Sequence, residues 1–356
     1  MRYPIKSYPL KNFLKFFINN FILKNPTPFL LSYEITQRCN AKCGFCGYWR
    51  LKNASFGLPL DKIEKIFNDG YDLGCVLLAI TGGEPLLRKD IAEVFEVAKK
   101  TGFSTLLLTN GYLLPEKIHE LQKFIDSINI SVDFPDKRHD EIRGLPNLLE
   151  KTVEGIRLAR NYGIAVNMNC VLTAQHSLED VRKLMFMAKE LDTTVSFEPV
   201  FETPTPEGSI LGSMRKEDAD LLRINDWSFV KRVADMLLYY KKNGFGRTVL
   251  NTDAFLKLMR DRADYVCYPF SMQLGIAYNG DVTSMCVLGI PEGYLGNALN
   301  QNLKEIWYSE RAQTLREKYR QCGLARKYGC YLFCVTEPSL PFTNSSVFLD
   351  YVKRVI

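Results

Sequence analysis

Short apolar runs alternate with amphipathic segments between residues 29 and 200 of the chain. The apolar runs predict strands over Phe29–Ile35, Val76–Ile80, Ser104–Leu108, Ser127–Val132, Ile164–Leu172 and Thr194–Val200. Between them, apolar residues three and four positions apart predict helices over 60–69, 89–101, 115–124, 147–162 and 178–191. This alternation predicts an α/β fold with a parallel sheet, open or curved into part of a barrel. Functional sites of such sheets lie at the carboxyl ends of the strands.

Capping residues mark the ends of several predicted helices. Ser177 precedes the helix over 178–191, and Asp180 follows three residues later, which is an N-cap pattern. Gly102 and Gly163 each lie between a helix and a strand, where C-capping glycines are expected.

The strand–helix rhythm stops after Val200. Residues 201–213 are rich in Pro, Gly and Ser and predict a loop, and helical segments follow over 216–243 and 252–261. From Cys267 the chain becomes turn-rich and Cys-rich, with a hairpin turn at Asn279–Gly280. We therefore expect four parts, which cover 1–28, 29–245, 263–338 and 339–356.

The N-terminal part, 1–28, contains a basic amphipathic segment. As a helix, residues 10–24 place Phe13, Phe17 and Phe21 on one stripe, and no acidic residue precedes Glu34. Such a helix can lie on an anionic membrane surface, or it can pack against the core of its own domain. The sequence leaves both open. It contains no apolar stretch long enough to span a membrane, and the interrupted apolar run does not fit a cleaved signal peptide.

Composition excludes several classes of protein. The 356 residues are 46% hydrophobic and 24% charged, as in ordinary globular proteins, so disorder, collagen and coiled coil do not fit. A net charge of +6 is too weak to indicate nucleic-acid binding. Three scattered His give little material for a His-rich zinc site or a Ser-His-Asp triad, whereas ten Cys are unusually many for a cytosolic protein.

Three of these cysteines, Cys39, Cys43 and Cys46, follow directly on the first predicted strand. Zinc would need a fourth ligand nearby, and a redox pair would need only a Cys-x-x-Cys. Three thiolates on one tight loop suit a [4Fe–4S] cluster with one iron left open to a small molecule.

With this CxxxCxxC motif, the chain resembles the radical SAM enzymes over about residues 29–200. The resemblance implies a partial (β/α)6 barrel with a small Cys-rich C-terminal domain, and S-adenosylmethionine bound to the open iron. In the family, a loop like Thr81–Pro85 (TGGEP) holds the amino group of S-adenosylmethionine, so Gly82, Gly83 and Glu84 are implied binding residues. The further implied contacts are Phe45 near the adenine, Ser131 and Asp133 near the ribose, and Asn110 and Asn169 facing the cleft. A turn role before Pro135 is the alternative for Asp133.

The C-terminal cysteines resemble the SPASM/twitch extension of these enzymes, as does the stretch LGNALNQNLKEIW. Because the chain has five cysteines here and lacks the Cys-x-x-Cys pair of the full pattern, the resemblance implies one auxiliary [4Fe–4S] cluster. Its expected ligands are Cys267, Cys286, Cys330 and Cys334, with Cys322 as the substitute for Cys330. A zinc knuckle and disulfides are the alternatives.

Cys75 and Cys170 stand in apolar contexts and are predicted to be buried structural thiols.

The resemblance implies an oxidoreductase that cleaves S-adenosylmethionine to a 5′-deoxyadenosyl radical. That radical abstracts a hydrogen from a substrate, or adds to it. Glu198 is a candidate substrate contact or base, with a capping or ion-pair role as the alternative. We expect a cytoplasmic enzyme with a flavodoxin- or ferredoxin-like electron donor. Its substrate is a peptide or protein, or a membrane lipid or isoprenoid reached by contact with the inner membrane surface. The alternative function is an iron–sulfur electron carrier or scaffold that does not cleave S-adenosylmethionine.

Overall fold

The computed structural model describes residues 16, 18–22, 26–201, 214, 216–284, 286, 293–323, 326 and 330–343. Its strands form one sheet in the order β6-β5-β4-β3-β2-β1-β7-β8-β9. They are β1 (Leu30–Glu34), β2 (Leu77–Thr81), β3 (Ser104–Thr109), β4 (Ser127–Ser131), β5 (Ala165–Leu172), β6 (Thr194–Pro199), β7 (Gln273–Ile276), β8 (Asp281–Thr283) and β9 (Tyr294–Asn297). All neighbouring pairs among β1 to β6 are parallel, so the six predicted strands and the α/β fold are confirmed.

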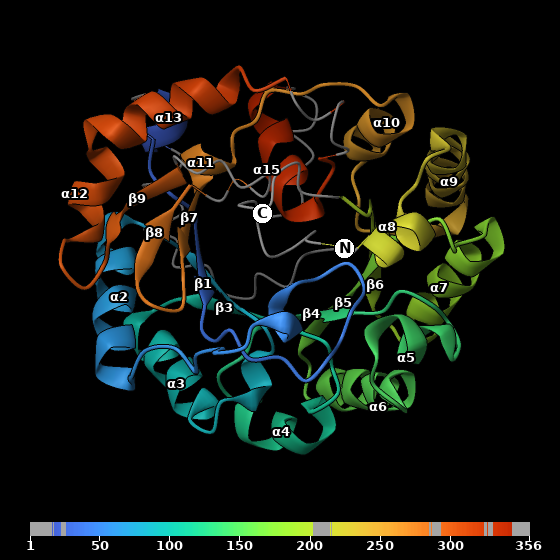
Figure 1. Cartoon of the computed structure of the whole chain (residues 1–356), viewed down its shortest axis with the longest axis horizontal. Helices are drawn as coiled ribbons and strands as arrows, with labels where there is room; N and C mark the ends of the chain where they lie inside the picture. The colour runs from blue at the N-terminus through green and yellow to red at the C-terminus, as the bar shows by residue number, and fades with distance from the viewer. Residues whose placement is uncertain are drawn as a thin grey trace.

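Helices cover the outer face of the curved sheet (Figure 1). They are α2 (Leu60–Leu73), α3 (Ile91–Thr101), α4 (Leu114–Leu121), α5 (Arg138–Arg143), α6 (Leu148–Asn161), α7 (Leu178–Glu190), α8 (Lys216–Leu222), α9 (Trp227–Tyr240), α10 (Asp253–Asp261), α11 (Pro269–Met272), α12 (Leu303–Tyr308), α13 (Glu310–Arg320) and α15 (Phe333–Thr343). The shorter turns are η1 (Ile18–Ile22), η2 (Tyr48–Arg50), η3 (Pro85–Leu87) and η4 (Lys241–Phe245).

Two features of the helices differ from the sequence prediction. The helical segment over 216–243 is divided, because Asp226 accepts a hydrogen bond from the backbone N–H of Ser228 and begins a new helix, α9. The short helix α5 was not predicted, since six residues are too few for a periodic pattern. The capping box of Ser177 and Asp180 on α7 is present as predicted.

The two faces of the strands differ in character. Leu31 and Tyr33 of β1 point outward to α2, where Tyr33 meets the Phe67 ring edge-on at 6.1 Å between centroids. Their neighbours Ser32 and Glu34 therefore point to the inside of the curve. The same alternation gives the other inward-facing polar residues, which are Asn129, Ser131, Asn167, Asn169, Ser196, Glu198 and Gln273. The outer face is an apolar core. The inner face is polar along β4, β5 and β6, whereas Leu106 and Leu108 make it apolar on β3.

The C-terminal part continues the same sheet. β7 pairs in parallel with β1, and the predicted turn at Asn279–Gly280 joins β7 to β8 as an antiparallel hairpin. α15 packs against β6 and α10 and runs across the predicted boundary at 338/339. The four-part division of the chain stays a prediction.

Most of the predicted N-terminal helix over 10–24 lies outside the described residues. Within it, Phe16 is buried and packs edge-on against Phe29, with 5.2 Å between ring centroids. Just beyond it, the indole N–H of Trp307 donates a hydrogen bond to the carbonyl of Pro26 at 2.7 Å. These contacts dock the described part of the segment on the chain's own core. In the part of the chain that the structure describes, no helix is long and apolar enough to cross a membrane.

Candidate functional site

The loop that carries Cys39, Cys43 and Cys46 begins five residues after β1, at the carboxyl end of the sheet. Burial raises the pKa of the Cys39 thiol to about 12, and the nearby charges of Cys43 and Cys46 act in the same direction. Burial raises the pKa of Cys43 to about 11, with Cys46 again adding to the effect. The three thiols therefore lie close enough to oppose one another's ionisation, and a cationic centre between them would relieve that opposition.

The Thr81–Pro85 loop packs directly against the start of the cysteine loop. The backbone N–H of Gly83 donates to the carbonyl of Thr36 at 2.8 Å, and that of Glu84 donates to the carbonyl of Arg38 at 2.7 Å. A Cβ atom at Gly83 would lie 2.2 Å from the Arg38 oxygen, so only glycine fits there. The close approach that these glycines permit in this structure is to the chain's own backbone.

Glu84 is buried, and the chain satisfies both of its carboxylate oxygens. One oxygen accepts from the Thr109 hydroxyl at 2.8 Å and the Leu86 N–H at 3.1 Å, and the other accepts from the Asn110 N–H at 2.8 Å. Burial raises the pKa of Glu84 to about 7, although these hydrogen bonds lower it. The Asn110 side chain in turn donates to Asn40 in the cysteine loop at 2.8 Å. Glu84 and Asn110 are thus brought together beside the cysteine loop.

Arg143, at the last position of α5, was missed by the sequence analysis. Its Nη1 lies 3.8 Å from the sulfur of Cys43, and its backbone carbonyl accepts from the N–H of Lys42 at 2.7 Å. Gly144 follows with a φ of 61° and ends the helix in the left-handed conformation. The arginine followed by a capping glycine was the only available sequence signal, and by itself it does not indicate a site.

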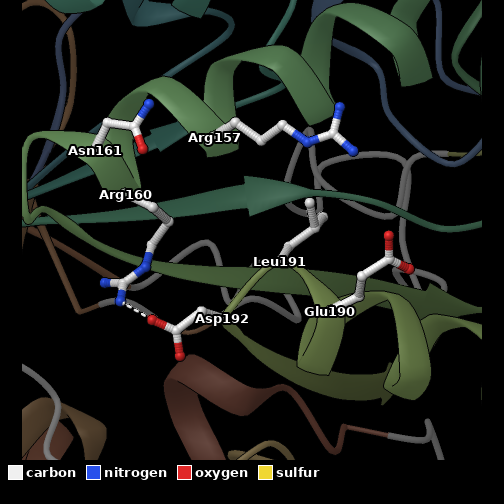
Figure 2. A pocket seen from close by; sticks show the side chains of 6 residues that line it. All are labelled: Arg157, Arg160, Asn161, Glu190, Leu191 and Asp192. Carbon is white, nitrogen blue, oxygen red and sulfur yellow. Dashed lines mark hydrogen bonds and ion pairs between the residues drawn. The ribbon is translucent and has the colours of Figure 1, made fainter.

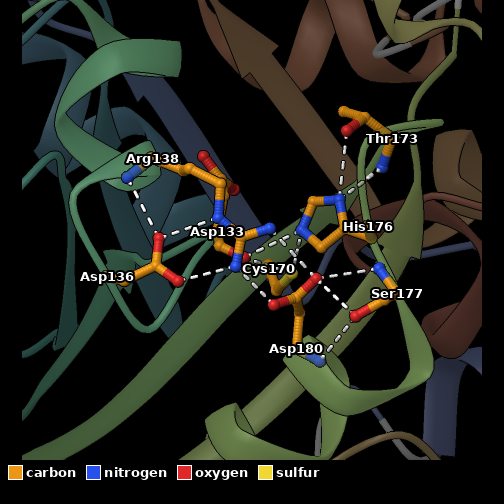
Figure 3. Close-up of polar contacts among 8 residues, drawn as sticks. All are labelled: Asp133, Asp136, Arg138, Cys170, Thr173, His176, Ser177 and Asp180. Atoms are coloured by element: carbon orange, nitrogen blue, oxygen red, sulfur yellow. Dashed lines mark hydrogen bonds and ion pairs between the residues drawn. The ribbon is translucent and has the colours of Figure 1, made fainter.

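Asp133 is fully buried and pairs with Arg143 through both carboxylate oxygens, at 2.7 and 3.2 Å. One of these oxygens also accepts from the Val171 N–H at 3.0 Å, and the Asp133 carbonyl accepts from Nε2 of His176 at 2.8 Å (Figure 3). Asp133 therefore has no accessible surface to offer a ribose. In this structure Asp133 holds Arg143, and its expected ribose contact stays a prediction.

A ladder of polar side chains crosses the inner face from β4 to β6. The Asn167 amide donates to Asn129 at 2.7 Å and to Ser196 at 2.9 Å, and Ser196 donates to Asn169 at 2.8 Å. Asn169 donates to Glu198 at 2.9 Å. The ladder places Asn169 and Glu198 side by side on this wall.

The other oxygen of Glu198 accepts from the N–H of Phe333, the first residue of α15, at 2.6 Å. Glu198 thus caps that helix, which is the alternative role considered for it in the sequence analysis. Of the other expected contacts, Phe45 is half-buried with its ring 5.5 Å from the Arg143 guanidinium, and Ser131 is half-buried at the end of β4.

The C-terminal cysteines fall into two groups. Burial raises the pKa of the Cys267 thiol, and the charges of Cys330, Cys322 and Cys286 raise it further. Cys334 differs, because it is exposed, whereas Cys330 is buried. The structure therefore groups Cys267, Cys286, Cys322 and Cys330, with Cys334 to one side.

Both thiol groups fit iron–sulfur clusters. All ten cysteines are free, so no disulfide is found, and Cys75 and Cys170 are buried as predicted. Among the residues that the structure describes, no three or more His, Cys, Asp or Glu side chains converge as the ligands of one metal ion do. A zinc knuckle needs that convergence, whereas a [4Fe–4S] cluster takes each thiolate on a different iron.

A surface pocket of about 450 Å³ lies at the opposite end of the sheet (Figure 2). Its lining comes from the ends of α6 and α7, just before β5 and β6 begin, and includes Arg157, the ion pair of Arg160 with Asp192, and Glu190. Because it lies at the amino ends of the strands, this pocket is separate from the cysteine loop.

A curved parallel sheet with three thiols on the loop after its first strand defines a class of iron–sulfur enzymes built on a partial barrel. The radical SAM superfamily matches residues 33–188, and the iron–sulfur cluster-binding domain SPASM matches residues 267–331. The chain belongs to the radical SAM superfamily and is an enzyme of that family. Its cofactors are a [4Fe–4S] cluster, S-adenosylmethionine and an auxiliary iron–sulfur cluster.

Among curated proteins, the chain is 27% identical to the AdoMet-dependent heme synthase of Methanosarcina barkeri over 82% of this chain and 84% of that protein. It is 33% identical to the GTP 3′,8-cyclase of Haemophilus ducreyi over 49% of this chain and 53% of that protein. Among solved structures, Streptococcus suis SuiB bound to S-adenosylmethionine has a TM-score of 0.65 at 20% identity, covering 86% of this chain and 71% of that one. anSMEcpe with bound AdoMet has a TM-score of 0.62 at 21% identity, covering 84% and 87%. These two likenesses establish the fold alone.

Proposed function

We propose that this enzyme cleaves S-adenosylmethionine reductively and takes a hydrogen atom from a polar, uncharged or cationic substrate of the peptide or protein class. When bound, the cluster and S-adenosylmethionine supply one-electron cleavage of the S–C5′ bond to methionine and a 5′-deoxyadenosyl radical. Cys39, Cys43 and Cys46 would hold the first cluster, and the loop around Glu84 would position the amino group of S-adenosylmethionine. An external one-electron donor of the flavodoxin or ferredoxin type would supply the electron.

The polar inner wall is the observation that carries the substrate class. Its amides and hydroxyls, from Asn129 to Ser196, are suited to hydrogen bonding with backbone amides. A lipid or isoprenoid chain would offer no hydrogen-bonding group to this wall. The buried Phe16 also argues for a docked N-terminal segment over a membrane contact. We therefore do not propose a lipid substrate reached through membrane contact of the N-terminal segment.

The charge of the wall separates the proposed substrate from those of the relatives. The strands β1 to β7 contain no Lys, Arg or His, while Glu34 and Glu198 both face inward. A nucleoside triphosphate, as in the name of GTP 3′,8-cyclase, would find no cation on these strands to balance its charge. We therefore do not propose a nucleotide substrate.

A haem-type tetrapyrrole is the second candidate. It is favoured by the likeness to AdoMet-dependent heme synthase, which extends over more than four fifths of both chains. The absence of cations from the described strands speaks against it, since the carboxylates of a tetrapyrrole would need partners from elsewhere in the chain.

For the proposed auxiliary site we assign Cys267, Cys286, Cys322 and Cys330. Their mutual electrostatic effects support the assignment, and the stretch that matches the cluster-binding domain ends at residue 331, before Cys334.

Deuterium transfer tests the proposed substrate class. The reduced, reconstituted enzyme is incubated anaerobically with S-adenosylmethionine and, in separate reactions, with peptide, lipid and tetrapyrrole fractions from cells grown in heavy water. Mass spectrometry of 5′-deoxyadenosine should detect deuterium with the peptide fraction. Deuterium from the lipid fraction alone, or from the tetrapyrrole fraction alone, would overturn the peptide assignment in favour of that class.

A further inference from the structure

Arg143 and Asp133 form a buried ion pair beside the first cysteine loop, and a contribution to folding does not explain it. Arg143 is 6% exposed and Asp133 is 0% exposed, and two N–H groups of the guanidinium bind the two carboxylate oxygens. Removing two charges from water costs about as much free energy as their attraction returns, so a buried pair is weak support for folding. The orientation of this pair, however, is specific.

The guanidinium lies between the carboxylate and the cysteine loop. Nε and Nη2 bind Asp133, which leaves Nη1 as the nitrogen that faces the sulfur of Cys43 at 3.8 Å. The positive end of the pair is therefore nearer to the thiol than the negative end.

Several contacts hold the pair in this orientation. The N–H of Gly44 donates to the carbonyl of Ile142 at 3.4 Å, beside the bond from Lys42 to Arg143, so the end of α5 is fixed to the cysteine loop. On the other side, the N–H of Val171 holds the Asp133 carboxylate. His176 holds the Asp133 carbonyl (Figure 3). The guanidinium cannot turn away from Cys43 without breaking this network.

We propose that Arg143 is a positioning residue that raises the reduction potential of the cluster on Cys39, Cys43 and Cys46. This inference rests on the proposed function, which places a cluster on these three thiols. A reduced cluster carries one more negative charge than an oxidised one, and the potential of such clusters depends on nearby charge and on hydrogen bonds to sulfur. A fixed cation in a buried site stabilises the more negative state, because little water screens it. Arg143 would thereby ease entry of the electron.

Two substitutions should shift the potential in opposite directions. Arg143→Met keeps an unbranched, flexible side chain and removes the cation, so the midpoint potential should become more negative. At the wild-type midpoint, the ratio of reduced to oxidised cluster should fall about tenfold, which is about 59 mV for a one-electron couple. Asp133→Asn removes the counter-charge and should shift the midpoint to a more positive value.

Arg138→Met is the matched control. Arg138 lies on the same helix and is paired with Asp136 and Asp180. Its charge is directed to α7 and away from Cys43, so the loss of this ion pair should leave the midpoint unchanged.

The experiment is an anaerobic redox titration of the full chain, followed by electron paramagnetic resonance without S-adenosylmethionine. The first cluster is identified beforehand as the signal that S-adenosylmethionine perturbs. Absence of that signal from the wild type would refute the proposed function and this inference together. If the signal is present, an unchanged or more positive midpoint in Arg143→Met overturns the inference alone. Arg143→Lys keeps the charge and should keep a midpoint near that of the wild type. If the midpoint of Arg143→Lys instead equals that of Arg143→Met, charge is not the cause and the inference fails. If Arg143→Met loses its iron, Arg143→Lys alone decides, and a strongly lowered midpoint in Arg143→Lys overturns the inference.

Discussion

The first cysteine loop takes its three thiols from residues 39–46, whereas the proposed C-terminal site takes its thiols from residues 267 to 330. The first loop is fixed by backbone hydrogen bonds to two other segments, one at Gly83 and Glu84 and one at the end of α5. The C-terminal thiols have no such continuous frame among the described residues. Instead, single side-chain contacts tie their segments to the barrel, such as the bond from Gln273 to the carbonyl of Cys334 at 2.7 Å.

This difference relates the sequence spacing of a site to the precision of its geometry. A loop whose ligands are close in sequence needs little chain entropy to bring them together, whereas distant ligands depend on the whole domain being folded. We therefore expect the first site to survive local changes elsewhere, and the C-terminal site to depend on the packing of α15 and β7.

The largest effect should come from removing the first site. Two [4Fe–4S] clusters would give about eight iron atoms per chain, and Cys39→Ala with Cys43→Ala and Cys46→Ala should leave about half of that iron. The measurement is iron analysis after anaerobic reconstitution. The double change Cys75→Ala and Cys170→Ala, at the two buried structural thiols, is the control and should keep all the iron. Full iron in the triple variant would show that the first site is misassigned.

The next prediction separates the two groups of C-terminal thiols. Cys322→Ala should remove the auxiliary cluster and lower the iron content by up to half, because Cys322 lies in the group with Cys267 and Cys330. Cys334→Ala should keep most of it. The reverse result would restore the ligand set expected from the sequence, with Cys334 in place of Cys322.

The sequence predicted most of the fold and the local part of the site. Apolar runs and periodic segments were sufficient for β1 to β6 and for their helices, because each such element carries its own pattern over several residues. The cysteine loop and the Thr81–Pro85 loop were likewise visible as short contiguous motifs. Arg143 and the burial of Asp133 were not, because they depend on which segments meet in space.

Glu198 illustrates the same limit. Its place at the end of β6 made it a candidate substrate contact, and its carboxylate accepts a hydrogen bond from Asn169. That its second oxygen caps α15, more than a hundred residues away in the chain, could not be predicted from one sequence.

Acid should weaken the network around Asp133, and this tests how firmly the first loop is fixed. Nδ1 of buried His139 accepts from the Asp133 N–H at 3.1 Å, and burial lowers the pKa of His139 from 6.5 to about 4. Between these values the unfolded chain binds more protons, so the free energy of unfolding should rise with pH from about 4 to 6.5 and level off above. The loss at pH 4 should be about 3 kcal/mol.

Thermal melts of the apo chain across this range measure the effect. His139→Asn keeps an acceptor near the Asp133 N–H and removes the titration, so its melting temperature should depend less steeply on pH. His119→Asn, on exposed α4 surface, is the control and should keep the wild-type slope. Identical slopes for wild type and His139→Asn would contradict the role given to His139.

The smallest effect should come from a helix cap that contacts none of the thiols. Ser177→Ala removes the side-chain acceptor for the Asp180 N–H at the start of α7. It should lower the free energy of unfolding by about 1 kcal/mol, measured by denaturant titration, and leave the iron content unchanged. Loss of iron in this variant would show that the cluster sites depend on the stability of α7, which contradicts the expectation that the first site survives local changes elsewhere.

The central claim is that the first cysteine loop is where S-adenosylmethionine is cleaved, and that the C-terminal site is not required for that step. The most direct measurement is 5′-deoxyadenosine formed by the reduced, anaerobic protein with S-adenosylmethionine alone. Wild type and the double variant Cys267→Ala with Cys286→Ala should both form it, and the triple variant at Cys39, Cys43 and Cys46 should form none. Product from the triple variant, or no product from wild type that holds both clusters, would contradict the claim.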